Sequence, residues 1–157
     1  METHPGSGLK TYADTSAVMS LFLGDRHASE ARAAFSQAGT VVWTPWQKVE
    51  FGNALRALVC RQTISLKELG GVENAMRQAI EAGLLLPVPL PAYQLWQEAE
   101  KLSLLYTPSL GVRTLDLLHV AAARVLRCRE FITCDDRQGL LVAKAGLHLV
   151  DASAKAG

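Results

Sequence analysis

At 157 residues, of which 49% are hydrophobic, the chain is long enough to bury one substantial core but too short for two. Its net charge of +1 gives no overall basic field, so any contact with a nucleic acid must be local. No apolar run approaches the roughly 20 residues of a membrane span, and residues 1–9 lack the apolar core of a signal peptide. We expect one cytoplasmic domain over 9–151, with flexible tails at 1–8 and 152–157 and no membrane partner.

The strand signals are short apolar or β-branched runs, each bounded by turn residues. Strands are predicted at 9–13, 40–43, 130–134 and 147–150. Residues 84–90 are also apolar, but Pro87 and Pro89 favour an edge strand or an irregular extension.

Helical patterns fill the segments between these strands. Thr44 followed by Pro45 is a strong helix start, and Ser65 with Glu68 forms a capping box. Helices are predicted at 17–23, 27–37, 45–61, 65–83, 91–106, 114–127 and 138–145. Alternating strands and helices imply an α/β fold with a mostly parallel sheet covered on both faces, whose sites form beyond the carboxyl ends of the strands.

Four acids stand at the edge or in the middle of apolar segments, where an isolated carboxylate is costly to bury. Asp14 follows a strand and could simply cap the next helix. Glu50 shares one largely apolar helix face with Trp46 and Ala54, although a solvated acid belongs on the opposite face. Asp116 opens a helix that is apolar on nearly every side, so it needs a metal or a paired cation for compensation.

The fourth acid is Asp135, with Asp136 beside it at the end of a strand. Side chains alternate along a strand, so Asp135 should face the same side as Thr133. We therefore place Asp135 in the site and interpret Asp136 as the cap of the following helix, although Asp136 could share or take over the role.

Carboxylates gathered within a few ångströms repel one another and raise one another's pKa values unless a cation neutralises them. Oxygen ligands without a neighbouring His or Cys select Mg²⁺ or Mn²⁺ over zinc. Such ions position phosphates and activate water for in-line attack, so the pattern indicates phosphodiester hydrolysis.

Four segments carry a resemblance to a known family: YADTSA at 12–17, VEF at 49–51, RTLDLLHVAAA at 113–123 and FITCDDRQ at 131–138. They resemble the PIN-domain ribonucleases, and the chain looks most like the VapC toxins of type II toxin–antitoxin pairs. The likeness covers about residues 10–150, and its strength lies in four motifs that occur in the right order.

The resemblance implies an α/β/α sandwich with a central, mostly parallel sheet and an endoribonuclease that depends on Mg²⁺ or Mn²⁺. It also implies an RNA substrate, an antitoxin that blocks the site and a homodimer. The family's acids map onto Asp14, Glu50, Asp116 and Asp135. Its supporting hydroxyls map onto Ser16 and Thr133.

Other residues have weaker claims to a functional role. Basic side chains that could hold an RNA backbone are Lys48, Arg56, Arg61, Arg113 and Arg137. Arg113 is the best of them, three residues before Asp116, and it could instead pair with an acid. His119 could transfer a proton but is more typical of a core residue.

The tryptophans and cysteines favour structural interpretations. Trp43, Trp46 and Trp96 could stack on bases, but their apolar neighbours favour core or interface packing. Cys60, Cys128 and Cys134 lack the C-x-x-C spacing of zinc or redox sites, so we interpret them as buried thiols in a reducing compartment.

Two other functions stay open at this point. An enzyme of the same fold could mature RNA outside a toxin–antitoxin pair, or a module could keep the acidic pocket and bind RNA or protein without cleavage. A haloacid-dehalogenase-type phosphatase would need a second acid where Ser16 stands, and the P-loop motif is absent.

Overall fold

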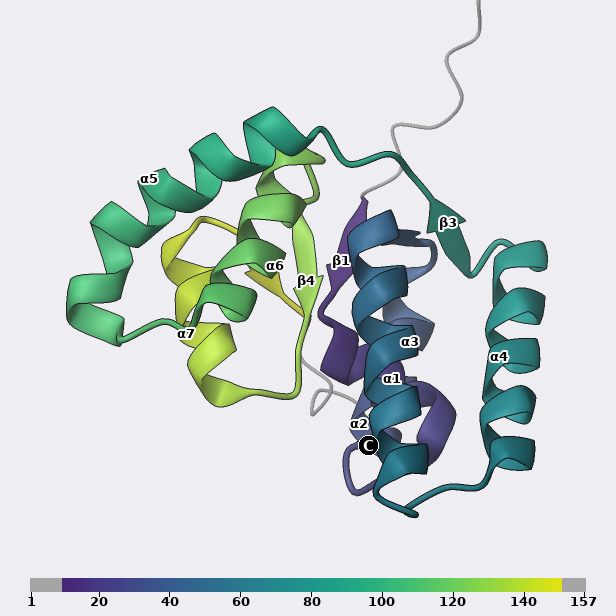
Figure 1. Ribbon diagram of the computed structural model, residues 1–157. Helices are drawn as coiled ribbons and strands as arrows, with labels where there is room; N and C mark the ends of the chain where they lie inside the picture. Colours follow the sequence, from purple (N-terminus) through teal and green to yellow (C-terminus); the bar gives the residue numbers. More distant parts are fainter. Residues whose placement is uncertain (1–9, 151–157) are drawn as a thin grey trace, which may run out of the picture.

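The computed structural model describes residues 10–150, and in it a five-stranded sheet has the order β3-β2-β1-β4-β5 with every pairing parallel (Figure 1). The strands are β1 (Thr11–Ala13), β2 (Val41–Trp43), β3 (Leu85–Pro87), β4 (Glu130–Ile132) and β5 (His148–Leu149). The helices are α1 (Thr15–Leu23), α2 (Ala28–Ala38), α3 (Pro45–Cys60), α4 (Leu66–Glu81), α5 (Ala92–Leu110), α6 (Thr114–Val125) and α7 (Asp136–Lys144). The tails expected at 1–8 and 152–157 lie outside the described residues.

Two helical layers cover the sheet, because successive side chains of each strand point to opposite faces. Tyr12 and Phe131 pack with α5, α6 and α7, whereas Ala13 and Ile132 pack with α1, α2, α3 and α4. Figure 1 shows the first group of helices on one side of β1 and β4, with α1, α3 and α4 on the other. The predicted α/β/α sandwich is confirmed.

The predicted elements are all present, but several of their ends differ. Helices α1 and α7 begin two residues earlier than predicted, because Asp14 and Asp135 are their caps. Helix α5 continues past the predicted end at residue 106 and contains Pro108. Proline costs this helix one backbone hydrogen bond near its end, and the helix stops only at Gly111, whose φ of 62° is left-handed.

The helices differ in how completely they are buried. Every residue of α6 from 117 to 123 is buried, whereas α4 buries only Met76 and Ala79. Within residues 10–150, no helix combines the length and the apolar character that crossing a membrane requires.

Strand β1 is the topological switch point of the sheet. The chain runs from β1 through β2 to β3 on one side and then returns to place β4 on the other side of β1. In open parallel sheets, sites form beyond the carboxyl ends of the strands at such a point. Asp14 follows β1 and Thr133 follows β4, and the Asp14 amide donates to the Ile132 carbonyl at 3.1 Å.

Gln47 fixes α3 to this edge of the sheet. Its side chain is fully buried, Nε2 donates to the Ala13 carbonyl at 2.8 Å, and Oε1 accepts from the Thr44 amide at 2.7 Å. The Thr44 hydroxyl in turn accepts from the Gln47 amide, so Thr44 and Gln47 form a reciprocal capping box at the start of α3. Gln47 therefore sets the position of α3 relative to the residue just before Asp14.

We predict that Gln47→Leu lowers the free energy of unfolding by about 1–3 kcal/mol, because it leaves a buried amide and a buried carbonyl without partners. Urea unfolding measures the change. The exposed Gln94→Leu on α5 is the matched control and should stay within about 0.5 kcal/mol of the wild type. Equal stability of the two variants would contradict the role of Gln47.

Candidate active site

Asp14 is almost completely buried at the carboxyl end of β1, at 6% exposure. Its Oδ1 accepts from the Ala17 amide at 2.8 Å and caps α1, while Oδ2 accepts from the Thr133 hydroxyl. The cap interpretation of Asp14 is therefore correct. Because Thr133 directly follows β4, its hydrogen bond to Oδ2 also links the ends of β1 and β4 at the site.

Glu50 extends from α3 towards α6. Its Oε2 accepts from the Thr15 hydroxyl at 2.5 Å and lies 2.8 Å from His119 Nε2. The Glu50 side chain is 25% exposed and the His119 side chain 4%, so the pair lies at the border between core and solvent. The helical spacing, which predicted that Glu50 lies on an apolar face and not on a solvated one, agrees with this position.

The partners of His119 define its tautomer. Its Nδ1 lies 2.9 Å from the Tyr12 hydroxyl and 3.4 Å from Trp46 Nε1, and an indole nitrogen can only donate. Nδ1 is therefore the acceptor, and Nε2 carries the proton that is donated to Glu50. The prediction of a buried His119 is confirmed, but this core residue also contacts a site acid.

A pocket of about 300 Å³ brings these side chains together. Its lining includes Asp14, Glu50, Asp116 and His119, together with Ser16 and Arg113. Asp116 is half-buried in the first turn of α6, and Gln138 Nε2 from α7 donates to its carbonyl at 3.0 Å. Three of the four predicted acids thus converge on one pocket beyond the end of β1.

The three acids differ in their electrostatic environment. Burial raises the pKa of Asp14, and the hydrogen bonds from Thr133 and Ala17 only partly oppose it. Burial and the nearby charge of Asp135 raise the pKa of Asp116. Burial alone would raise the pKa of Glu50, but the hydrogen bonds from His119 and Thr15 outweigh it, and that pKa is lowered.

The fourth acid has a different setting. Asp135 is exposed, and its Oδ1 accepts from the amides of Arg137 and Gln138 as the cap of α7. The prediction that Asp136 caps this helix is wrong, because β4 ends at Ile132 and α7 already includes Asp136. Asp135 does not line the pocket of Asp14, although its charge acts on Asp116.

Some contacts in the site were not predicted from the sequence. Thr15, rather than Ser16, gives its hydroxyl to a site acid, while Ser16 is exposed on the pocket wall. Tyr12 reaches His119 from the face of β1 opposite Ala13. The signal for Thr15 was present in the run of residues 14–16, but only the fold shows which hydroxyl turns inward.

The structural interpretations of Trp and Cys were partly correct. Trp43 is buried and Trp46 packs partly buried on the core, whereas Trp96 is 57% exposed, so core packing is wrong for Trp96 and interface packing or base stacking stays open for it. Burial raises the pKa of Cys128 to about 12. Cys60 is exposed, which makes the prediction of a buried thiol wrong there.

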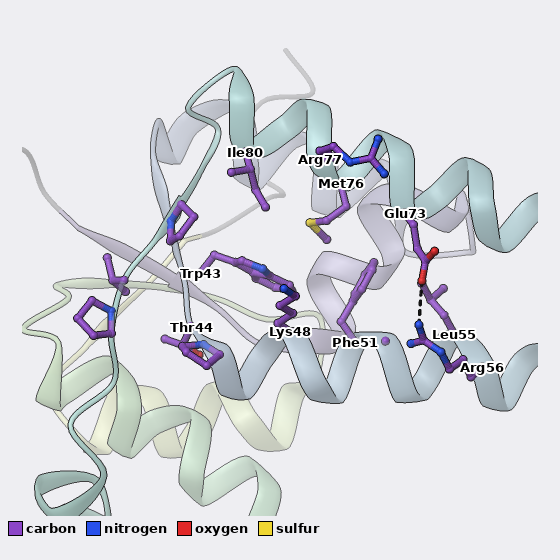
Figure 2. A pocket seen from close by; sticks show the side chains of 15 residues that line it. Trp43, Thr44, Lys48, Phe51, Leu55, Arg56, Glu73, Met76, Arg77 and Ile80 are labelled. Carbon is purple, nitrogen blue, oxygen red and sulfur yellow. Dashed lines mark hydrogen bonds and ion pairs between the residues drawn. The ribbon is translucent and has the colours of Figure 1, made fainter.

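A larger pocket of about 740 Å³ lies between α3, α4 and the segment after β3 (Figure 2). Trp43, Phe51 and Met76 give it an apolar floor, and Arg56 pairs with Glu73 at 3.0 Å on its wall. It contains none of the predicted site acids. Its lining suits the binding of an apolar partner better than hydrolysis.

The donor set of the smaller pocket fits a hard divalent cation, since its carboxylates offer only oxygen. Within residues 10–150, no three of the four predicted acids have ligand oxygens all within 4.8 Å of one another. This spacing suits an ion that keeps several waters and is held by one or two direct carboxylates, as is usual for Mg²⁺.

Comparison with solved structures finds the same fold in proteins of low sequence identity. VapC20 of Mycobacterium tuberculosis, described as a sarcin-ricin loop cleaving toxin, has a TM-score of 0.59 at 16% identity, covering 83% of this chain and 93% of its own. VapBC-1 of nontypeable Haemophilus influenzae has a TM-score of 0.59 at 14% identity, with 92% and 98% covered. FitAcB of Neisseria gonorrhoeae has a TM-score of 0.57 at 15% identity, with 90% and 97% covered.

A search of curated protein sequences gave no match. The model of the PIN domain family, in contrast, matches residues 11–143, which include all four predicted acids. This span starts at β1 and ends inside α7, so it contains both the switch point and the elements that build the pocket. The chain belongs to the PIN domain family.

Proposed function

We propose that this chain is an endoribonuclease that depends on Mg²⁺ or Mn²⁺ and acts as the toxin of a VapBC-type toxin–antitoxin pair. The observation that carries the proposal is the convergence of Asp14, Glu50 and Asp116 on one pocket at the switch point of the sheet. Membership of the PIN domain family supports nuclease activity. The fold shared with VapC20 and VapBC-1 supports the toxin assignment and RNA as the substrate.

Asp14, Glu50 and Asp116 would hold the ion directly or through water, and Asp135 would complete the acidic ring or help to bind a second ion. When bound, such an ion polarises the scissile phosphate and lowers the pKa of an attacking water. The hydrolysis needs no covalent enzyme intermediate.

The remaining site residues would bind the RNA or orient the acids. The exposed Arg113 at the pocket wall would contact an RNA phosphate, with Ser16 as a hydrogen-bonding neighbour. Thr133 holds one oxygen of Asp14, and Asp136 adds negative charge next to Asp135. His119 keeps Glu50 turned towards the pocket, so it is a positioning residue rather than a catalytic one.

Two surfaces support the proposed protein partners. Helix α5 exposes Tyr93, Trp96, Leu104 and Leu105, which is apolar area suited to a homodimer. The pocket of Figure 2 offers an apolar floor for an antitoxin segment.

We predict that Asp14→Asn reduces RNA cleavage more than about 100-fold, because loss of residues that only orient metal ligands already costs about 10–100-fold. Asparagine caps helices as well as aspartate does, so α1 should persist. Gel analysis of RNA fragments with Mn²⁺ and with EDTA measures the effect. Full activity of the variant, or equal cleavage in EDTA, would refute the metal-dependent nuclease.

Two further outcomes separate the alternatives. A binding module would retain RNA without producing fragments under any metal condition. A nuclease that matures RNA would cleave, but its induced expression in a bacterial host would not arrest growth. The toxin should arrest growth, and the Asp14→Asn variant should not.

In EDTA, Asp14→Asn should be more stable to heat than the wild type at neutral pH. The raised pKa of Asp14 means that its stabilising contribution is complete below the unfolded value of about 3.9 and is lost as the pH rises through the folded value. The melting temperature of the wild type should therefore fall relative to the variant between about pH 4 and pH 7. A constant difference across this range would contradict the raised pKa.

His119→Ala should weaken activation by Mn²⁺ by about 10–100-fold in apparent affinity, because Glu50 loses its fixed orientation. His119→Gln should recover part of the loss, since its amide can still donate to Glu50. Cleavage rates measured over a series of Mn²⁺ concentrations test this. A folded His119→Ala protein with an unchanged Mn²⁺ requirement would exclude the positioning role.

A further inference from the structure

Three side chains of the kinds that bind zinc meet outside the acidic pocket. His27 precedes α2, Glu30 lies in the first turn of α2, and Cys134 lies in the loop between β4 and α7. One ligand atom from each lies within 4.8 Å of the other two, and within residues 10–150 this is the one such grouping of three His, Cys, Asp or Glu. The sequence does not predict this group, because Cys134 is distant in the chain from His27 and Glu30 and the group has no C-x-x-C spacing.

The distance between His27 and Glu30 suits a shared metal better than a hydrogen bond. His27 Nδ1 and Glu30 Oε2 are 3.5 Å apart, which exceeds the usual hydrogen-bond range of about 2.7–3.2 Å. Two ligands about 2.0–2.1 Å from one tetrahedral Zn²⁺ lie about 3.4 Å apart. The two residues are three positions apart at the start of α2, His27 as its N-cap residue and Glu30 in its first turn.

The imidazole of His27 is not used to cap its helix. The His27 side chain makes no capping hydrogen bond, and its backbone amide is held instead by Asp25 Oδ1 at 2.9 Å. Its Nε2 accepts from Arg26 Nε at 3.0 Å. Binding a metal through Nδ1 moves the ring proton to Nε2, so the exposed Arg26 side chain must turn into solvent.

The surroundings of Cys134 favour a cation and let one enter. Burial, and after it the carboxylates of Asp14, Glu30 and Asp25, raise the pKa of the Cys134 thiol to about 11, so a thiolate here needs a cation beside it. Two surface pockets of about 840 and 690 Å³ meet at Cys134, with His27 lining the first and Glu30 the second. An ion from solvent therefore reaches the group without movement of the core.

We propose that His27, Glu30 and Cys134 bind a Zn²⁺ ion, with a water molecule as the fourth ligand. Binding forms the sulfur–zinc bond and releases the thiol proton of Cys134 to solvent. A set of one sulfur, one nitrogen and one oxygen selects zinc over Mg²⁺, which requires oxygen ligands. The ion joins α2 to the loop that carries Thr133 and Asp135, and the proposal does not depend on RNA cleavage.

Titration of the full chain with Co²⁺ tests the site, because a Co²⁺–thiolate bond gives a charge-transfer absorption in the near ultraviolet. The wild type should show this band at one equivalent, and added Zn²⁺ should remove it. Cys134→Ser should abolish the band. His27→Ala and Glu30→Gln should each weaken the apparent Co²⁺ affinity at least about tenfold. Loss of a residue that only orients a metal ligand already costs about 10–100-fold in affinity, and loss of the ligand itself should cost no less.

Two controls make the result specific. Cys60→Ser removes the exposed thiol at the end of α3 and should leave the band unchanged. The double variant Asp14→Asn, Asp116→Asn disables the acidic pocket and should also keep it, which separates this site from the proposed nuclease ion. Circular dichroism confirms that each variant is folded. No band in the wild type, a band that survives Cys134→Ser, or full affinity in both His27→Ala and Glu30→Gln would overturn the proposal.

Discussion

Burial of the Asp14 carboxylate at the carboxyl end of β1 is the constraint on which the site depends. A buried carboxylate without partners costs several kcal/mol, and here both oxygens are hydrogen-bonded, one by the backbone of α1 and one by Thr133 after β4. These contacts fix the direction of α1 and the spacing of the two central strands. Because these hydrogen bonds only partly oppose the effect of burial, the pKa of Asp14 stays raised, and a nearby cation would stabilise its ionised form.

The second acid depends on the core rather than on the backbone. Glu50 is held by His119, and His119 is held by Tyr12 and Trp46, which pack in the layer of α5, α6 and α7. The ring of Tyr12 also stacks on Phe131 at 5.3 Å between centroids. The orientation of Glu50 therefore depends on the packing of this core layer, and a core substitution near Tyr12 affects both.

Local signals in the sequence determine much of this architecture. The cap at Thr44, the capping box at Ser65 and the edge position of β3, which carries Pro87, follow from rules that involve neighbouring residues only, and all three are confirmed. The cap of α7 shows where such rules fail, because the sequence predicted Asp136 and the structure has Asp135. The cap is set by the residue at which β4 stops pairing, and pairing depends on the neighbouring strands. The proximity of His27 to Cys134 is likewise a product of tertiary packing.

The pocket draws its walls from segments far apart in the chain. Asp14 and Glu50 come from the first third of the sequence, whereas Arg113, Asp116 and His119 come from the last third. A chain emerging from the ribosome therefore cannot complete the acidic pocket until α6 has been synthesised and has packed against the earlier elements. For the nuclease proposed above, this order of assembly separates synthesis from activity, because the nascent chain carries Asp14 and Glu50 before it carries the helix that supplies Asp116 and His119.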